Sequence, residues 1–147
     1  MVEIHEMIES ARDKVRGFLK LIDADFEEYD TGMFTIEEGS AVIGITLRPW
    51  HDGDVVVEFT SQLVSGAELD ADRMRWLLET NADMHFGGFG LLFDGTVIYS
   101  YAVPAGLLDS ETFGAVARTV AALADHYDDE VVDVAGGETG VAATVEG

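Results

Sequence analysis

Apolar side chains recur every three or four positions along the first 22 residues, which is the period of one face of an α-helix. The stripe consists of Ile4, Met7, Ile8, Ala11, Val15, Phe18, Leu19 and Ile22. Glutamates lie in the early turns of this segment, whereas Arg16 and Lys20 lie near its end. That order suits the helix macrodipole. The pattern therefore predicts a long amphipathic helix at the start of the chain.

The pattern then changes to short segments that alternate apolar and polar residues or run continuously apolar, as is typical of β-strands. These segments are residues 25–30, 33–38, 41–47 and 54–64. Turn residues separate them, namely Thr31-Gly32, Glu38-Gly39 and Asp52-Gly53. Because one face of the longer segments is apolar and the opposite face is half polar, we expect a helix to cover one face only. The other face is left for solvent or a partner.

A second helix is predicted from Asp70 or Asp72 to residues 81–84. Two more strands, 88–93 and 96–103, follow it and are joined by an Asp-Gly turn. Asp109 can cap a third helix, whose apolar stripe runs from Phe113 to Tyr127. The order is helix, three strands, helix, two strands, helix, and we predict an α+β fold with an antiparallel sheet.

The run Gly87-Gly88-Phe89-Gly90 lies between the second helix and a strand. Loops that bind phosphate place their glycines after a strand and before a helix, where free N–H groups face the anion. Here the order is reversed, and glycine is the usual residue at the end of a helix. We interpret the run as a turn.

A chain of 147 residues is of the size of one domain. We assign residues 1–134 to a single domain. The last residues, 135–147, are small and Gly-rich, so we expect a flexible tail there.

The charge limits the possible partners, because 29 acidic side chains stand against 8 basic ones and the formal net charge is −21. Such a surface repels nucleic acid and anionic membranes. The acids could mimic DNA or attract a basic partner. They are scattered along the whole chain, however, which favours adaptation to a salt-rich cytoplasm, where salt screens self-repulsion. The chain also shows no signal peptide and no apolar run of membrane-spanning length, so we expect a cytoplasmic protein.

No residue pattern in the sequence indicates a particular reaction. The chain has no cysteine, its four histidines are dispersed, and no G-x-S-x-G occurs. Acids flank His126, but neighbouring acids at a helix end are usually solvated, so we expect no metal site there. We accordingly predict no catalytic residue, no metal and no cofactor.

Three aromatic residues are candidates for contact with a partner. Trp50 lies beside the Asp52-Gly53 turn, and Tyr99 and Tyr101 lie in a strand with two largely apolar faces. A helix on each face, a second subunit or a bound peptide could cover that strand.

Three strings and the order of elements resemble the YbjN family, whose domain is related to the type III secretion chaperones of the CesT kind. The strings are "GMFTIEEGSAVIGITL", "LLETNADMHFGGFGLLFDG" and "VPAGLLDSETFGAVARTVAALADHYDDEV". The resemblance covers roughly residues 1–134. It implies an α+β fold, often dimeric, that binds segments of other proteins and has no known catalytic centre.

The resulting hypothesis is a cytoplasmic, non-enzymatic domain that binds a protein client or peptide segment and forms a homodimer. Trp50, Tyr99 and Tyr101 are its expected contact residues. The alternative is a small-molecule-binding regulatory domain, or a small enzyme with a pocket between sheet and helices.

Overall fold

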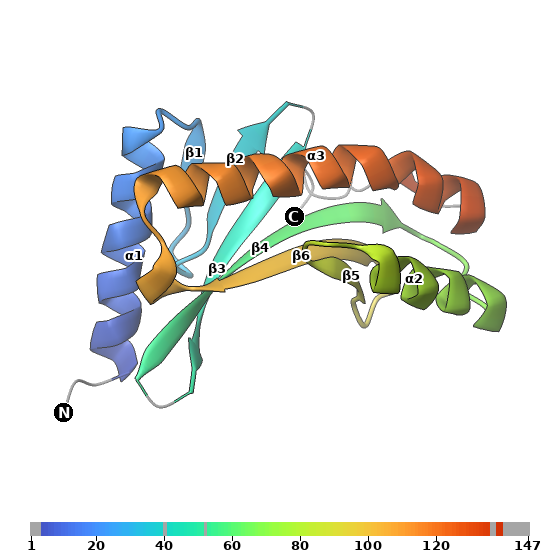
Figure 1. The fold of residues 1–147 in the computed structure, drawn as a ribbon, viewed down its shortest axis with the longest axis horizontal. Helices are drawn as coiled ribbons and strands as arrows, with labels where there is room; N and C mark the ends of the chain where they lie inside the picture. Colours follow the sequence, from blue (N-terminus) through green and yellow to red (C-terminus); the bar gives the residue numbers. More distant parts are fainter. Residues whose placement is uncertain (1–3, 40, 52, 136–137, 140–147) are drawn as a thin grey trace.

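The computed structural model describes residues 4–39, 41–51, 53–135 and 138–139 (Figure 1). In chain order the elements are α1 (Ile4–Leu21), β1 (Phe26–Glu28), β2 (Phe34–Glu38), β3 (Ala41–Trp50), β4 (Asp54–Ser65), α2 (Ala71–Asp83), β5 (Gly88–Leu91), β6 (Val97–Pro104), the 3₁₀ helix η1 (Ala105–Leu107), α3 (Ser110–Ala135) and β7 (Glu138–Thr139). The predicted α+β order is confirmed, with four strands rather than three before α2. No helix within the described ranges is long and apolar enough to cross a membrane.

The strands form one antiparallel sheet in the order β1-β2-β3-β4-β6-β5, and β7 pairs with the end of β4. β7 falls within the segment expected to be a flexible tail. Residues 136–137 and 140–147 of that segment lie outside the described residues.

Helices cover one face of the sheet, as the half-polar strands predicted. α1 and α3 lie across this face (Figure 1), and the Phe113 ring of α3 packs between Phe59 and Phe18 with centroid distances of 5.3 and 5.5 Å. Alternate strand residues supply the buried core, because successive side chains point to opposite faces. The fully buried side chains include Phe34, Ile43, Ile45, Val57, Phe59, Val97 and Tyr99.

α2 packs on the same face near the far end of the sheet. Asp70 caps it by accepting a hydrogen bond from the backbone N–H of Arg73. Its Trp76 ring stacks on Phe89 at 6.0 Å, and Phe89 in turn meets Tyr127 of α3 edge to face at 5.3 Å. The strand that carries Tyr99 and Tyr101 is therefore covered by helices on one face only.

Gly87 lies in the connection between α2 and β5, whereas Gly88, Phe89 and Gly90 of the run interpreted as a turn belong to β5. The geometry at Gly87 requires glycine. Gly87 has φ +62°, and a Cβ atom there would lie 2.3 Å from the carbonyl oxygen of Ser100. The chain thus passes from α2 into β5 in close contact with β6.

Candidate functional site

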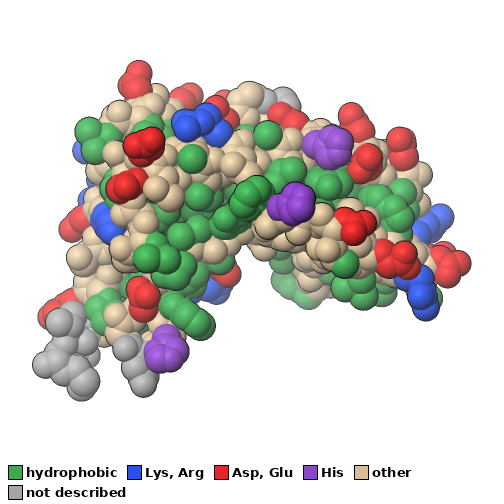
Figure 2. All heavy atoms as spheres, viewed as in Figure 1, with side chains coloured by type: hydrophobic (Ala, Val, Ile, Leu, Met, Phe, Trp, Pro, Cys, Tyr) green, Lys and Arg blue, Asp and Glu red, His purple; other side chains and the backbone are tan. Residues whose placement is uncertain are grey.

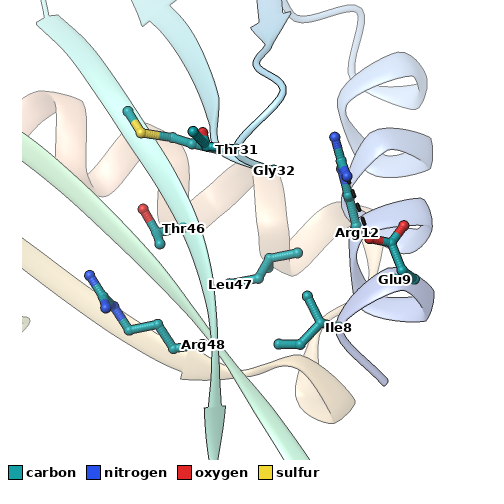
Figure 3. Close-up of a pocket in the computed structure, with 9 residues that line it drawn as sticks. Ile8, Glu9, Arg12, Thr31, Gly32, Thr46, Leu47 and Arg48 are labelled. Atoms are coloured by element: carbon teal, nitrogen blue, oxygen red, sulfur yellow. Dashed lines mark ion pairs between the residues drawn. The ribbon is translucent and has the colours of Figure 1, made fainter. Parts of the chain in front are cut away.

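A groove lies between α1 and β3. Its volume is about 340 Å³ and its lining residues are Ile8, Glu9, Arg12, Thr31, Gly32, Met33, Thr46, Leu47 and Arg48. We call it the α1–β3 groove. In Figure 3, Ile8 and Leu47 point towards one another across it. Its centre is therefore apolar, and polar side chains surround it.

The groove exists because β3 is longer than its neighbour β2. β2 begins at Phe34, which pairs with Ile45, so Thr46–Trp50 have β4 on one side only. Alternate residues of an antiparallel strand point their N–H and C=O groups to the same neighbour. By this alternation the N–H and C=O of Leu47 face the side that β2 leaves empty, and the groove runs along that side.

β1 presents a second unpaired edge. The backbone bonds from Tyr29 N–H to Met33 C=O, at 2.8 Å, and from Glu37 N–H to Asp25 C=O, at 3.4 Å, show that the odd-numbered residues of this segment face β2. The N–H and C=O groups of Phe26 and Glu28 therefore face outward. No hydrogen bond within the described ranges reaches these four groups, which we call the β1 edge.

The other strand edges are less accessible to an added strand. On β5, the Asn81 side chain accepts a hydrogen bond from the N–H of Phe89 at 2.7 Å and donates one to its C=O at 3.4 Å. On β3 and β6 the free edges end at Pro49 and Pro104, the two prolines of the chain. Proline lacks the N–H that a further strand would need. Of the edges of β1, β3, β5 and β6, the β1 edge thus has the most outward backbone groups without a partner within the described ranges.

An ion-pair cluster joins α1 to β1 beside both features. Glu28 accepts two hydrogen bonds from Arg16, each at 2.7 Å, and one from Arg12 at 2.8 Å. Arg16 in the first place, and Arg12 with it, lower the pKa of Glu28 to about 2. Arg12 also reaches Glu9 at 3.5 Å and the carbonyl of Tyr29 at 3.3 Å. The cations beside the groove are already engaged, so the groove suits an apolar chain better than an anion.

The three aromatic residues proposed from the sequence lie in two places. Trp50, at the end of β3, is 51% exposed and its ring lies 5.5 Å from that of His51. Tyr101 is half-buried and stacks on Phe86 at 6.0 Å. Tyr99 is fully buried and donates a hydrogen bond to the carbonyl of Phe86.

The strand register separates Trp50 from the two tyrosines. Trp50 pairs with Asp54 and Tyr101 with Phe59 on β4, which places them about 17 Å apart along the strand at the usual rise of a β-strand. Tyr99 and Tyr101 meet around Phe86, whereas Trp50 lies at the other end of the sheet.

Apolar side chains are also exposed on α2 and after it. Figure 2 shows hydrophobic side chains gathered in the hollow between α1 and α2. The exposed large side chains of this part of the chain are Met74, Leu78, Phe86, Leu91, Leu92 and Phe93. Phe86 stacks on Tyr101 on the helix-covered face, whereas Leu92 lies in a hollow with Ile98 and Ser100 on the opposite face, so these side chains are exposed on both sides of the sheet. Exposed apolar surface of this kind is typical of interaction sites.

Sequence reasoning missed the α1–β3 groove and the β1 edge, because both depend on which strands pair and where each one stops. One signal was available. Proline within a strand pattern marks an edge, and both Pro49 and Pro104 lie at strand positions without a neighbour on the outer side.

Comparisons with known proteins give a matching family and a shared fold. A family model described as "T3SS (YopN, CesT) and YbjN peptide-binding chaperone 1" matches residues 6–143. No sequence among the curated proteins matches the chain.

Three solved structures share the fold. The ExsC–ExsE complex superposes with a TM-score of 0.65 at 16% identity, over 84% of this chain and 94% of that chain. The HopA1–SchA chaperone–effector complex gives 0.64 at 9% identity, over 88% and 99%. The Yersinia pestis type III secretion chaperone SycH, in complex with a fragment of YscM2, gives 0.51 at 12% identity, over 84% and 98%. At these identities the likeness establishes the fold.

Proposed function

Because the chain belongs to the family of T3SS (YopN, CesT) and YbjN peptide-binding chaperones, we propose that it is a non-catalytic adaptor that holds an extended segment of another protein beside α1. The observation that carries the proposal is the position of the unpaired β1 edge next to an apolar groove. An added strand gains backbone hydrogen bonds at such an edge, and a neighbouring pocket selects its side chains.

The turn between β1 and β2 connects the two features. β1 ends at Glu28, and Thr31 and Gly32 of the following turn line the α1–β3 groove. A segment that pairs with the β1 edge therefore meets the groove as it passes the turn. There an apolar side chain can pack between Ile8 and Leu47.

A second copy of the chain is the proposed cover for the apolar side chains exposed on α2 and after it. Homodimer formation would remove part of this apolar surface from water, and closed two-fold dimers are the commonest oligomers. We propose that Tyr101 and Phe86 contact a partner directly, and that Tyr99 acts by holding the backbone of Phe86. Trp50 offers a separate contact at the tip of the β3–β4 hairpin.

We further propose that the protein works in a salt-adapted cytoplasm. We propose no catalytic step for the chain, in keeping with a family description that names peptide binding.

The test begins with tagged protein purified from its own cells at native salt, followed by native mass spectrometry. The bound segment is then titrated against Ile8→Glu, which places a charge in the α1–β3 groove. We expect an affinity loss of about tenfold or more, since a carboxylate cannot be desolvated there without a partner. Ile4→Glu is the matched control, because Ile4 is 61% exposed and does not line the groove.

Equal binding by both variants would contradict the proposed site. A bait that carries only a small molecule would favour a ligand-binding regulatory domain instead.

A further inference from the structure

The chain segment around the β1 edge carries acidic side chains but no basic ones. No lysine or arginine occurs between Lys20 and Arg48. The same stretch contains seven acids: Asp23, Asp25, Glu27, Glu28, Asp30, Glu37 and Glu38. Any segment that pairs with the β1 edge therefore meets carboxylates contributed by this stretch.

These carboxylates are distributed unequally between the two faces of the sheet. Phe26 packs on Phe34 of the core with ring centroids 6.2 Å apart, so the even-numbered residues of β1 face the helices. Glu28 shares that face, and its charge is balanced by two arginines of α1. The helix-covered side of the β1 edge is thus electrostatically satisfied.

On the opposite face, the carboxylate charges are not balanced by basic side chains. Asp25 and Glu27 point to it and are exposed. Glu37 of β2 lies next to Asp25, because its N–H bonds to the Asp25 carbonyl at 3.4 Å, and it is exposed as well. None of these three carboxylates forms an ion pair within the described ranges. Glu27 accepts a hydrogen bond from the Tyr29 hydroxyl at 3.0 Å, but no basic side chain balances its charge. Three negative charges without a cationic partner in the described ranges therefore lie together at the border of this open face.

We infer that the client segment is an extended strand with lysine or arginine at every second position and apolar residues between them. A strand added at the β1 edge must alternate its side chains between the same two faces. On the open face, basic residues would lie beside Asp25 and Glu27, and opposite charges on neighbouring strands stabilise the pairing, whereas like charges oppose it. On the helix-covered face, apolar residues would lie beside Phe26.

This inference rests on the proposed peptide-binding function and specifies its client. The net charge of −21 gives every basic segment a general attraction. The structure adds a spacing requirement, since only alternate positions of the added strand meet the open-face carboxylates.

Fluorescent peptides of matched length test the inference at the lowest salt at which circular dichroism shows the fold intact. The probes are a Lys-Val alternating peptide, its block-ordered isomer with the lysines first, and a Glu-Val alternating peptide. We expect the alternating basic peptide to bind tightest and the acidic one not to bind. Binding should also slow hydrogen exchange of the Phe26 and Glu28 amides.

The double variant Asp25→Asn, Glu27→Gln should weaken binding of the alternating basic peptide by about two- to thirtyfold, the range expected for two cross-strand charge pairs. The control is Glu79→Gln, Asp83→Asn, which changes the net charge equally at exposed positions of α2. It should change the affinity less than twofold. Equal weakening by both pairs, or equal binding of the alternating and block-ordered peptides, would overturn the inference.

Different binding results distinguish a wrong inference from a wrong proposed function. If the natural client binds and Ile8→Glu abolishes its binding, but the alternating basic peptide does not bind, the function stands and the inference is wrong. If the natural client is unaffected by Ile8→Glu, the proposed function itself is wrong.

Discussion

The side-chain amide of Asn81 forms both hydrogen bonds to the backbone of Phe89 that a neighbouring strand would otherwise form. Its Oδ1 accepts from the Phe89 N–H at 2.7 Å, and its Nδ2 donates to the Phe89 C=O at 3.4 Å. One residue near the end of α2 thereby closes the outer edge of β5. Unpaired edges invite association with other chains, and folded proteins commonly cover them.

Asn81→Ala should therefore reopen the β5 edge. We expect a loss of about 1–2 kcal/mol in the free energy of unfolding, because the half-buried N–H and C=O of Phe89 lose their partners. We also expect species larger than those of the wild type in size-exclusion chromatography with light scattering. Glu79→Ala, an exposed change two residues earlier on the same helix, serves as the control. Identical unfolding curves and elution for the two variants would show that Asn81 does not protect the edge.

Gly87→Ala should destabilise the protein more than Gly95→Ala. Both glycines have positive φ, at +62° and +86°, so each alanine costs backbone strain of about 1–3 kcal/mol. Only at Gly87 would the new Cβ also meet a backbone atom, the Ser100 oxygen at 2.3 Å; at Gly95 nothing lies within 4 Å. Urea unfolding of the two variants measures the difference. Equal losses would mean that the close approach to β6 carries no cost.

The sequence predicted most of the fold because its periodicity is strong where the core is built. The three- and four-residue spacing of α1 and the alternation of Ile43, Ile45 and Leu47 placed the helices and strands correctly. The order of helix and strand placed Gly87 in the connection between them, but the rest of the run, Gly88 to Gly90, belongs to strand β5. Segments 25–30 and 33–38 form separate short strands, β1 and β2, which is why four strands precede α2.

The candidate site was harder to predict, because it lies where strands stop rather than where they form. The α1–β3 groove depends on β2 being shorter than β3, and no local pattern encodes that difference. Tyr99 illustrates a related limit: alternation placed it on an apolar face with Tyr101, but only the tertiary structure shows that its hydroxyl is buried against Phe86.

The Tyr99 hydroxyl should make stability fall at alkaline pH. Burial, with smaller contributions from Tyr101 and Tyr127, raises the pKa of Tyr99 to about 12, above its ordinary value near 10. Between these values the unfolded chain loses the proton and the folded chain keeps it, so stability is complete below about pH 10 and declines as pH rises towards 12. The decline in free energy of unfolding should be shallower in Tyr99→Phe. Parallel pH profiles for the two proteins would contradict this assignment.

Glu28 should have the opposite effect at acidic pH. Hydrogen bonds from Arg16 and then Arg12 lower its pKa to about 2, so the carboxylate contributes stability above the unfolded value near 4.3. That contribution is lost as pH falls from there towards 2, because the unfolded chain takes up the proton first. Glu28→Gln should remove this part of the pH dependence, as measured by denaturant unfolding between pH 5 and pH 2. An unchanged slope in Glu28→Gln would contradict this assignment.

Salt should stabilise the protein if its acidity is an adaptation to a salt-rich cytoplasm. With a net charge of −21 the folded chain repels itself, and raising KCl from 0.1 M to 1 M shortens the screening length from about 10 Å to about 3 Å. We expect the melting temperature to rise substantially over this range. A variant with Asp129→Asn, Glu130→Gln and Asp133→Asn, all exposed on α3, should reach the same stability at lower salt. A melting temperature that stays constant or falls would instead favour the interpretation that the acidic surface mimics DNA or attracts a basic partner.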